Sequence, residues 1–239
     1  MSVYDPFAEI YDEWAGVMTA DVPFYVDVAR EAAGSAVVEL AAGTARVAIP
    51  VARETGKRVI GIDSSPAMLA SARDSAEAAG VELDLREADM RDFEVEEPVS
   101  LVYCPFRSLL HLPTWRDRRR VFERVAAVLQ PGGRFAWNAF VFSPFVAARA
   151  HRRTRRHAEG SGIWERVTHV PADNRIDVEA WRDGEEERRR LSLWWVTRSE
   201  WEALLDVVGL ESEALYGWFD RRPFNDESEE FVWVARRPG

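Results

Sequence analysis

The sequence predicts an α/β fold with a doubly wound, largely parallel sheet. Between residues 37 and 142, short apolar runs alternate five times with segments of helical periodicity. Strands joined through helices in this way lie parallel, with helices on both faces of the sheet. From residue 163, strand-like stretches follow one another with only turns between them, which indicates an antiparallel insertion. Ligands of such sheets bind beyond the carboxyl ends of the strands, so functional residues are expected in the turns that follow them.

The first part of the chain contains five predicted strands and three predicted helices. Apolar runs indicate strands at residues 37–40, 59–63, 81–86, 100–106 and 134–142. Helical spacing of apolar residues indicates helices at about 46–55, 66–79 and 115–129. Pro66 is typical of a helix start, and Thr114 with Asp117 resembles a helix cap. The turn Pro131-Gly132-Gly133 is predicted to separate the third helix from the fifth strand.

The second part of the chain supplies an insertion and the edge of the sheet. Strands are predicted at 163–170, 175–182 and 189–196. A capping box at Thr197 and Glu200 opens a helix that extends to about residue 208. Two last strands, 211–216 and 231–236, are predicted to form an antiparallel hairpin. We therefore expect one domain over residues 1–239 with a seven-stranded mixed sheet, an N-terminal helical cap over about 1–33, and an antiparallel insertion over about 160–196, after strand five.

Composition and charge narrow the classes of function. The chain has 31 basic and 41 acidic side chains; residues 1–100 carry a net charge of −12 and residues 101–239 a net charge of +2. This split disfavours nucleic acid as a partner and favours a cationic ligand, although solubility explains most of the charge. No apolar run approaches ~18 residues and the N-terminus lacks a signal-peptide pattern, so we expect a cytoplasmic protein without a membrane partner. Cys104 alone forms neither an internal disulfide nor a thiolate cluster, and no metal site is expected.

Four motifs follow one another in an order that is typical of one enzyme family. They are Val38–Arg46 (VELAAGTAR), Gly61–Leu69 (GIDSSPAML), Ala88–Phe93 (ADMRDF) and Leu129–Gly133 (LQPGG). Together with Tyr11-Asp12 and the terminal hairpin, this set resembles the class I S-adenosylmethionine-dependent methyltransferases of the small-molecule branch. The resemblance covers nearly the whole chain. It implies a Rossmann-like fold, S-adenosylmethionine as cofactor, and methyl transfer to a small-molecule acceptor by in-line displacement.

The candidate cofactor residues lie at the ends of the first three strands. Glu39, at a strand end, is suited to a charged amino group, and the small-residue turn at Gly43 allows close approach of a ligand to the backbone. Asp63, about 20 residues further on, is suited to ribose hydroxyls. The resemblance adds Asp89 for the adenine amino group and Met90 for the ring face. The full predicted set is Glu39, Ala41, Gly43, Asp63, Ser64, Met68, Asp89, Met90 and Cys104.

Other interpretations of these residues stay open. Glu39 is otherwise a capping or solvated acid, Asp63 a helix N-cap, and Asp89 a turn residue. Ala41 and Ala45 stand where the family usually has glycine. An alanine is tolerated there if its φ angle stays negative, but its methyl group narrows the approach to the methionine part of the ligand. The alternative function is a non-catalytic cofactor-binding partner; a dinucleotide enzyme is more distant, because Gly-x-Gly-x-x-Gly is absent.

The candidate catalytic residues are His111, Arg107 and Tyr11. Methyl transfer is accelerated mainly by positioning and desolvation, and it needs a base only when the nucleophile starts protonated. If the segment after strand four is helical, Arg107 and His111 share a face, with Arg107 as a clamp for a carboxylate and His111 as the base. His111 is equally interpreted as a packing residue. Tyr11 either closes over the sulfonium or anchors the N-terminal segment.

Features of the second half bear on the acceptor. The turn after strand four lacks an Asn-Pro-Pro-Tyr-like string, which also favours a small molecule over nucleic acid. The basic run 149–157 either recognises an anionic acceptor or, as is more common, is a solvated face. Eight of the ten tryptophans lie at or after Trp137, where they suit an apolar acceptor pocket or a dimer surface. A monomer or a homodimer is expected.

Overall fold

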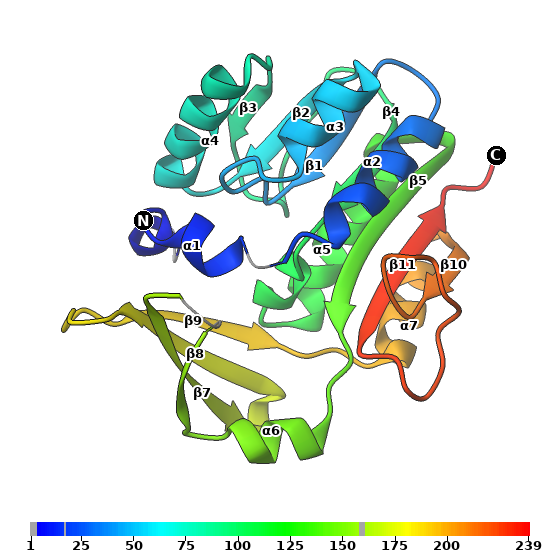
Figure 1. Ribbon diagram of the computed structural model, residues 1–239. Helices are drawn as coiled ribbons and strands as arrows, with labels where there is room; N and C mark the ends of the chain where they lie inside the picture. The colour runs from blue at the N-terminus through cyan, green and yellow to red at the C-terminus, as the bar shows by residue number, and fades with distance from the viewer. Residues whose placement is uncertain (1–3, 17, 158–160) are drawn as a thin grey trace.

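Two β-sheets form the framework of the molecule. The computed structural model describes residues 4–16, 18–157 and 161–239 (Figure 1). The larger sheet has seven strands in the order β10-β11-β5-β4-β1-β2-β3, which confirms the predicted seven-stranded sheet. Its strands are β1 (Ala36–Leu40), β2 (Arg58–Asp63), β3 (Asp84–Glu87), β4 (Val99–Cys104), β5 (Leu129–Phe140), β10 (Glu211–Tyr216) and β11 (Glu230–Arg236).

The direction of the strands defines where a ligand can bind. Strands β1 to β5 are mutually parallel, and β11 runs antiparallel to both β5 and β10, so the expected edge hairpin is confirmed. The strand order reverses between β1 and β4. In a sheet of this kind the crevice at the reversal, beyond the carboxyl ends of the strands, is the usual ligand site.

Several strand boundaries differ from the prediction: β3 begins at Asp84 rather than residue 81, and larger differences concern β4 and β5. Strand β4 ends at Cys104 rather than Phe106, because Phe106 and Arg107 have φ angles of 56° and 64°, outside the extended region. Strand β5 begins at Leu129, and the predicted Pro131-Gly132-Gly133 turn lies within its bounds. The register against β4 shifts near this point, and Gly132 pairs through its N–H with the carbonyl of Arg237.

The helices cover both faces of the large sheet. Helices α2 (Asp21–Glu31) and α3 (Ala48–Thr55) pack on the face that carries Val37, whereas α5 (Trp115–Val128) and α7 (Arg198–Val208) pack on the face of Val38. Alternate residues of a strand point to opposite faces, so neighbouring valines of β1 serve two different cores. Helix α4 (Pro66–Ala79) lies beside β2 and β3. Within the described ranges, none of these helices combines the length and hydropathy of a membrane span.

The predicted helix starts are confirmed by their capping bonds. The hydroxyl of Ser65 accepts a hydrogen bond from the N–H of Met68, that of Thr114 from Asp117, and that of Thr197 from Glu200. Each bond satisfies an N–H that has no partner within the first turn of its helix. Ser65, rather than Asp63, is therefore the cap of α4, which leaves the Asp63 side chain for other contacts.

The insertion after β5 forms a separate antiparallel sheet. Its strands are β6 (Thr154–Arg156), β7 (Ile163–Val170), β8 (Arg175–Arg182) and β9 (Arg189–Trp194), in that order. The second sheet thus begins earlier than residue 160, and helix α6 (Pro144–Ala150) precedes it. Strand β6 is exposed throughout and rich in arginine, so it has no apolar alternation that would indicate a strand.

The N-terminal segment lies between the two sheets (Figure 1). It contains a single 3₁₀ turn, η1 (Asp5–Phe7), and the short helix α1 (Tyr11–Ala15). Phe7 and Ile10 share an apolar cluster with Met68 of α4 and with Ile163 and Leu191 of the insertion. Arg189 also donates to the carbonyl of Pro6 at 2.7 Å. The predicted N-terminal cap therefore joins the two sheets; residues 1–3 and 17 of it lie outside the described residues.

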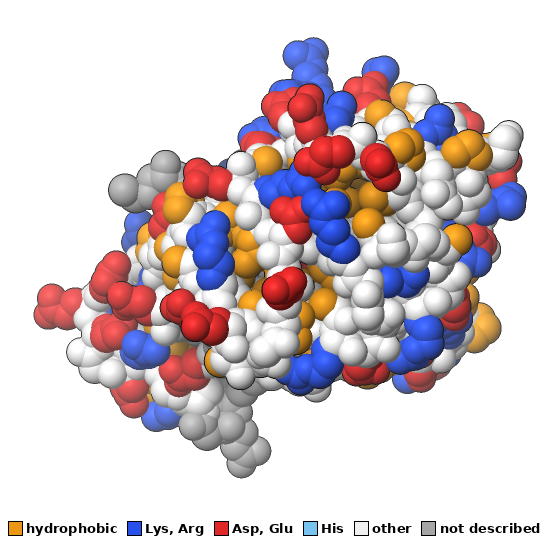
Figure 2. Space-filling view, turned by 90° about the horizontal axis from the view of Figure 1, so that it is seen from above, with side chains coloured by type: hydrophobic (Ala, Val, Ile, Leu, Met, Phe, Trp, Pro, Cys, Tyr) orange, Lys and Arg blue, Asp and Glu red, His pale blue; other side chains and the backbone are white. Residues whose placement is uncertain are grey.

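Charge is not segregated on the upper surface of the molecule. Seen from above Figure 1, acidic and basic side chains lie next to one another, with apolar groups between them (Figure 2). The acidic excess of residues 1–100 therefore does not form one continuous field on this face. Its consequences for a ligand depend on the few carboxylates that line a cavity.

Candidate active site

A cavity of about 270 Å³ lies at the carboxyl ends of β1 and β2. A ligand is expected at this place because the strand order reverses between β1 and β4. Nine of its lining residues belong to the predicted site set, and the others are mostly apolar. The lining residues are Tyr4, Tyr11, Ala41, Gly43, Ile62, Asp63, Ser64, Met68, Ala88, Asp89, Met90, Arg91, Ser108, His111 and Leu112.

The turn after β1 has an unusual backbone. Ala41, Gly43 and Ala45 have φ angles of 55°, 56° and 65°, so all three adopt the left-handed conformation. The condition under which alanine is tolerated here, a negative φ angle, is therefore not met. An L-residue in this region costs about 1–2 kcal/mol, because its Cβ approaches the following carbonyl. The turn is held by hydrogen bonds from Ala42 N–H to Ile62 and from Ala45 N–H to Ala42.

Asp63 connects this turn to the end of β2. Its Oδ2 atom accepts a hydrogen bond from the N–H of Gly43 at 2.8 Å, and its Oδ1 atom accepts one from the N–H of Ser65 at 2.8 Å. Burial raises the pKa of Asp63, and these N–H groups act against that rise. A carboxylate has about four acceptor positions, so the cavity side of Asp63 keeps capacity for ligand hydroxyls.

Glu39 lies behind the turn rather than on the cavity wall. Its side chain is 1% exposed and it does not line the cavity. Burial raises the pKa of Glu39 to about 8, although Tyr103 and Arg46 act in the opposite direction. Its Oε2 atom has no hydrogen-bond partner among the described residues. A buried polar atom without a partner is costly, and such atoms often mark a functional site.

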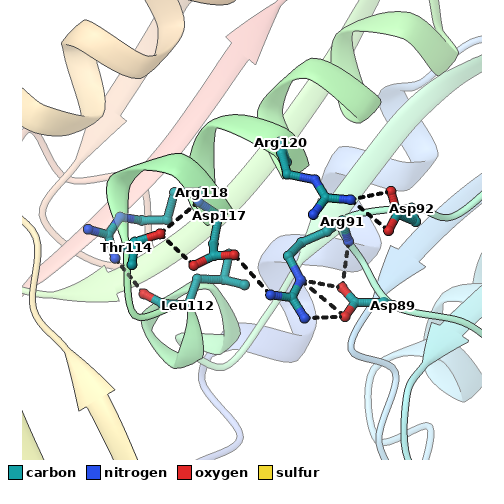
Figure 3. A network of polar contacts seen from close by, with 8 residues as sticks. All are labelled: Asp89, Arg91, Asp92, Leu112, Thr114, Asp117, Arg118 and Arg120. Carbon is teal, nitrogen blue, oxygen red and sulfur yellow. Dashed lines mark hydrogen bonds and ion pairs between the residues drawn. The ribbon is translucent and has the colours of Figure 1, made fainter.

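Asp89 lies on the cavity wall and is held by Arg91 (Figure 3). Its carboxylate accepts from the N–H of Arg91 at 2.8 Å and from the guanidinium at 2.5 Å. These bonds lower the pKa of Asp89. Arg91 also reaches Asp117 of α5 at 2.9 Å. Asp89 is thus both a turn residue and a cavity residue, and Arg91 is a lining residue that the sequence motifs did not indicate.

His111 and Tyr4 both line the cavity and form a pair. The Nε2 atom of His111 lies 2.6 Å from the hydroxyl oxygen of Tyr4, and the two rings meet edge to face at 5.0 Å. Burial lowers the pKa of His111 to about 4, although a hydrogen bond to the Ser192 backbone acts against this. His111 is therefore neutral at pH 7. Tyr4 was not predicted, because nothing in the sequence near it shows that it reaches residue 111.

Arg107 does not share a face with His111. The 3₁₀ turn η2 covers Ser108–His111 and leaves Arg107 outside it, with a φ angle of 64°. Its guanidinium binds Glu230 of β11 instead, with Nη2 to Oε2 at 2.7 Å and Nε to Oε1 at 3.1 Å. Glu230 is fully buried and also accepts from Asn138 at 2.7 Å. The expected carboxylate clamp is thus occupied by a carboxylate of the protein itself.

Of two further predicted site residues, Tyr11 lines the cavity and Cys104 does not. Cys104 does not line the cavity; its side chain is fully buried in the core cluster, and burial raises the pKa of its thiol. Tyr11 does line the cavity, and a methyl group placed on Gly43 would lie 3.7 Å from the Tyr11 ring. The N-terminal segment thus covers the turn after β1. Ser64, Met68 and Met90 also lie on the cavity wall.

A second, wider pocket of about 780 Å³ adjoins the first. It is formed by the insertion sheet together with Pro113 and His111. His111 is a lining residue of both hollows. The two hollows are therefore neighbours, and His111 lies at their border.

Comparisons with known proteins agree with this geometry. Residues 37–133 match the family described as methyltransferase domain. Methyltransferase GfsG from Streptomyces halstedii is 32% identical over 143 residues, which cover 56% of this chain and 46% of that protein. The chain spans about half to two thirds of the length of the curated relatives that it matches.

Two solved structures share the fold over nearly the whole chain. CcbJ methyltransferase from Streptomyces caelestis has a TM-score of 0.86 at 23% identity and covers 100% of this chain and 99% of its own. CalS10 from Micromonospora echinaspora, an amino pentose methyltransferase solved with its S-adenosylmethionine, has a TM-score of 0.64 at 25% identity, with coverage of 99% and 97%. Residues 37–133 thus resemble a methyltransferase domain, and the chain as a whole has the fold of these methyltransferase structures.

Proposed function

We propose that this protein transfers the methyl group of S-adenosylmethionine to a nucleophilic atom of a small molecule. The observation that carries the proposal is the cavity where the Gly43 turn and the Asp63 carboxylate meet, next to a wider pocket that shares His111 with it. The amino pentose methyltransferase activity named for CalS10 is consistent with a small-molecule acceptor. No specific observation favours a purely non-catalytic binding role.

The residues of the cavity suit this cofactor. Asp63 has acceptor capacity for the two ribose hydroxyls, and Met90 offers an apolar surface to the adenine ring. Asp89 is our candidate for the adenine amino group. Glu39 stays the candidate for the methionine amino group, because it is the buried acid ahead of the turn and its Oε2 atom lacks a partner among the described residues. Ala41 and Gly43 would approach the ligand through their backbone.

The chain must hold the acceptor in line and exclude water. When bound, the cofactor supplies a methyl group on a sulfonium, which is reactive without metal or acid assistance. Tyr4 and Tyr11 enter the cavity from the N-terminal segment, which lies between the two sheets. We assign to this segment the exclusion of water from the reacting atoms, and to Tyr11 a place over the sulfonium.

We assign to Tyr4 and His111 the removal of the proton that the acceptor loses when it is methylated. Since His111 is neutral, its Nε2 atom can accept a hydrogen bond from the Tyr4 hydroxyl, and Tyr4 lines the cavity, where its oxygen can meet an O–H or N–H of the acceptor. As the acceptor attacks, its proton moves to the Tyr4 oxygen and the Tyr4 proton moves to His111. A proton transfer of this kind contributes about 10²–10⁴-fold to rate.

Isothermal titration with S-adenosylmethionine and with S-adenosylhomocysteine tests the cofactor site. We expect both to bind, and Asp63→Asn to weaken both, because an amide presents only one acceptor oxygen to the backbone and the ribose. Ser71→Ala, on the outer part of α4, is the matched control and should leave binding unchanged. Failure of both ligands to bind the wild-type protein would refute the methyltransferase proposal.

The location, the oligomeric state and the class of acceptor can be tested separately. We propose that the protein acts in the cytoplasm as a monomer or homodimer and does not use nucleic acid as acceptor. A screen of small molecules with methyl-labelled cofactor addresses the acceptor, and light scattering after size-exclusion chromatography addresses the oligomeric state. Transfer of label to DNA or RNA at a rate comparable with small molecules would contradict the proposal.

A further inference from the structure

One face of the insertion sheet carries an ordered array of charged side chains. Alternate residues of β7, β8 and β9 point to this face and lie in register. Arg166, Glu179 and Arg190 form one row across the three strands, and Asp177 and Ser192 belong to the next. These residues line the wider pocket. The opposite face is the one that packs on the N-terminal segment, so the charged face is not needed for the core.

The array has more positive than negative charge. Arg166, Arg175, Arg190 and Arg152 all line the pocket, together with the two carboxylates of Glu179 and Asp177. Since His111 is neutral, the lining has an excess of two positive charges.

The pairing of these groups shows where the excess lies. The carboxylate of Glu179 forms ion pairs with the guanidinium groups of Arg190, at 2.8 Å, and Arg166, at 3.7 Å. The carboxylate of Asp177 forms an ion pair with Arg175 at 2.8 Å. Arg152 has no acidic partner within the described part of the chain. The excess positive charge of the pocket therefore lies on Arg152 and, in part, on Arg166, which is 3.7 Å from Glu179.

Arg152 is held at the pocket by its backbone. Its φ angle of 56° is in the left-handed region, which non-glycine residues seldom adopt. Its N–H donates to the carbonyl of Val167 in β7 at 2.7 Å. Strained residues of this kind are concentrated at ligand-binding positions. The backbone of Arg152 is thus fixed beside β7, and its exposed side chain lines the pocket.

We propose that the methyl acceptor is an anionic small molecule, whose carboxylate or phosphate binds between Arg152 and Arg166 while its nucleophile lies at His111. The inference rests on the proposed function and names its substrate class. His111 borders both hollows, so a molecule bound by the arginines has its other end at the cofactor cavity. Guanidinium groups bind carboxylates and phosphates through paired hydrogen bonds, which makes them suited to this selection.

Trp194 provides a local signal for the test, because it lines the same pocket. Phenyl phosphate and benzoate serve as probes for the two anion types, and benzyl alcohol serves as the neutral comparator. The Trp194-dependent emission is obtained as the difference between the wild-type protein and Trp194→Phe. We expect a saturable change with at least one anion and none with benzyl alcohol, and the stronger of the two anions identifies the preferred group.

Matched variants assign the binding to the pocket. Arg152→Gln combined with Arg166→Gln should weaken anion binding by about tenfold or more, since charge-assisted hydrogen bonds are lost. Arg149→Gln and Arg153→Gln remove the same charge from exposed positions outside the pocket and should leave binding unchanged. Equal binding of benzyl alcohol, no saturable anion response, or equal effects of the pocket and control variants would each overturn the inference.

Titration of the same proteins with S-adenosylhomocysteine separates the two proposals. We expect its affinity to be unchanged in each of these arginine variants, because none of the four arginines lines the cofactor cavity. Cofactor binding without anion binding would overturn the acceptor class alone. Absence of cofactor binding would overturn the proposed function itself.

Discussion

Tyr4 and His111 are joined by a hydrogen bond of 2.6 Å, although one comes from the N-terminal segment and the other from the turn after β4. The pair stands between the cofactor cavity and the wider pocket. Each residue helps to orient the other through this hydrogen bond between the phenol oxygen and the imidazole Nε2 atom. Removing the Tyr4 hydroxyl takes this partner away from the Nε2 atom of His111.

The first prediction concerns the Tyr4 hydroxyl. Tyr4→Phe keeps the ring but removes the proton relay, so kcat should fall by about 10²-fold if the acceptor reacts as a protonated nucleophile. The affinity for S-adenosylhomocysteine should change by less than about threefold, because Asp63 and the Gly43 turn are untouched. Steady-state kinetics and calorimetry measure the two quantities. An unchanged kcat would show that the acceptor loses its proton elsewhere.

The second prediction concerns pH and His111. Its pKa is about 4 in the folded protein, below the ordinary value of about 6.5. The unfolded chain therefore binds more protons between these two values, so this group's contribution to stability is present above pH 6.5 and is lost as pH falls toward 4. The loss is at most about 3 kcal/mol. Denaturant unfolding at several pH values should show a smaller slope over this range in His111→Gln.

Glu39 should give the opposite dependence. Its pKa is raised to about 8, above the ordinary value, so the folded protein holds the neutral carboxyl. Its contribution to stability is present below about pH 4.5 and is lost as pH rises through 8. Glu39→Gln mimics the neutral form and should stabilise the protein at pH 8.5 by up to about 4 kcal/mol. The same variant should bind S-adenosylmethionine more weakly if the carboxylate contacts the amino group. Equal stability of the two proteins at pH 8.5 would contradict the burial argument.

The left-handed alanines lead to a fourth prediction. Ala41→Gly removes a methyl group from the cavity wall and relieves an unfavourable φ angle, so stability should rise by up to about 1 kcal/mol and cofactor affinity should increase. Ala42→Gly is the matched control. Ala42 is buried and its φ angle is not in the left-handed region, so the control should lose about 1 kcal/mol instead. If Ala41→Gly and Ala42→Gly change stability in the same direction, backbone strain at Ala41 does not explain the effect.

The fifth prediction concerns Arg107 and Glu230. Arg107→Gln leaves a fully buried carboxylate without its ion partner and should destabilise the protein by about 3–5 kcal/mol. Adding Glu230→Gln should recover part of this loss, which a double-mutant cycle in denaturant detects. At a temperature where the single variant is folded, its KM for the acceptor should change little. A selective rise in that KM would restore Arg107 as a contact of the acceptor.

Local sequence signals were sufficient for the seven strands of the large sheet and for most of the cavity, but not for α6 and β6. The strand motifs around Gly43 and Asp63 predicted their meeting, because parallel strands end at one edge of a sheet. The helix starts at Thr114 and Thr197 followed from hydroxyl residues whose caps involve only three positions along the chain, and the start of α4 followed from Pro66.

Contacts between distant segments were beyond those signals. The partner of Arg107 is Glu230, on a strand that pairs with β5, and nothing near Arg107 indicates it. The partner of His111 is Tyr4, which reaches it only because the N-terminal segment lies between the two sheets. The sign of φ at Ala41 is similarly fixed by the surrounding turn, against the preference of the residue itself.

The position of the N-terminal segment has a practical consequence for anyone who purifies the protein. Tyr4 and Tyr11 form part of the cavity wall, so a purification tag fused ahead of them would be attached close to the cavity. The C-terminal end leaves the molecule beyond β11, on the far side of the large sheet from α1 (Figure 1). A tag placed there avoids the cavity, and a low activity measured with an N-terminal tag should be checked after its cleavage.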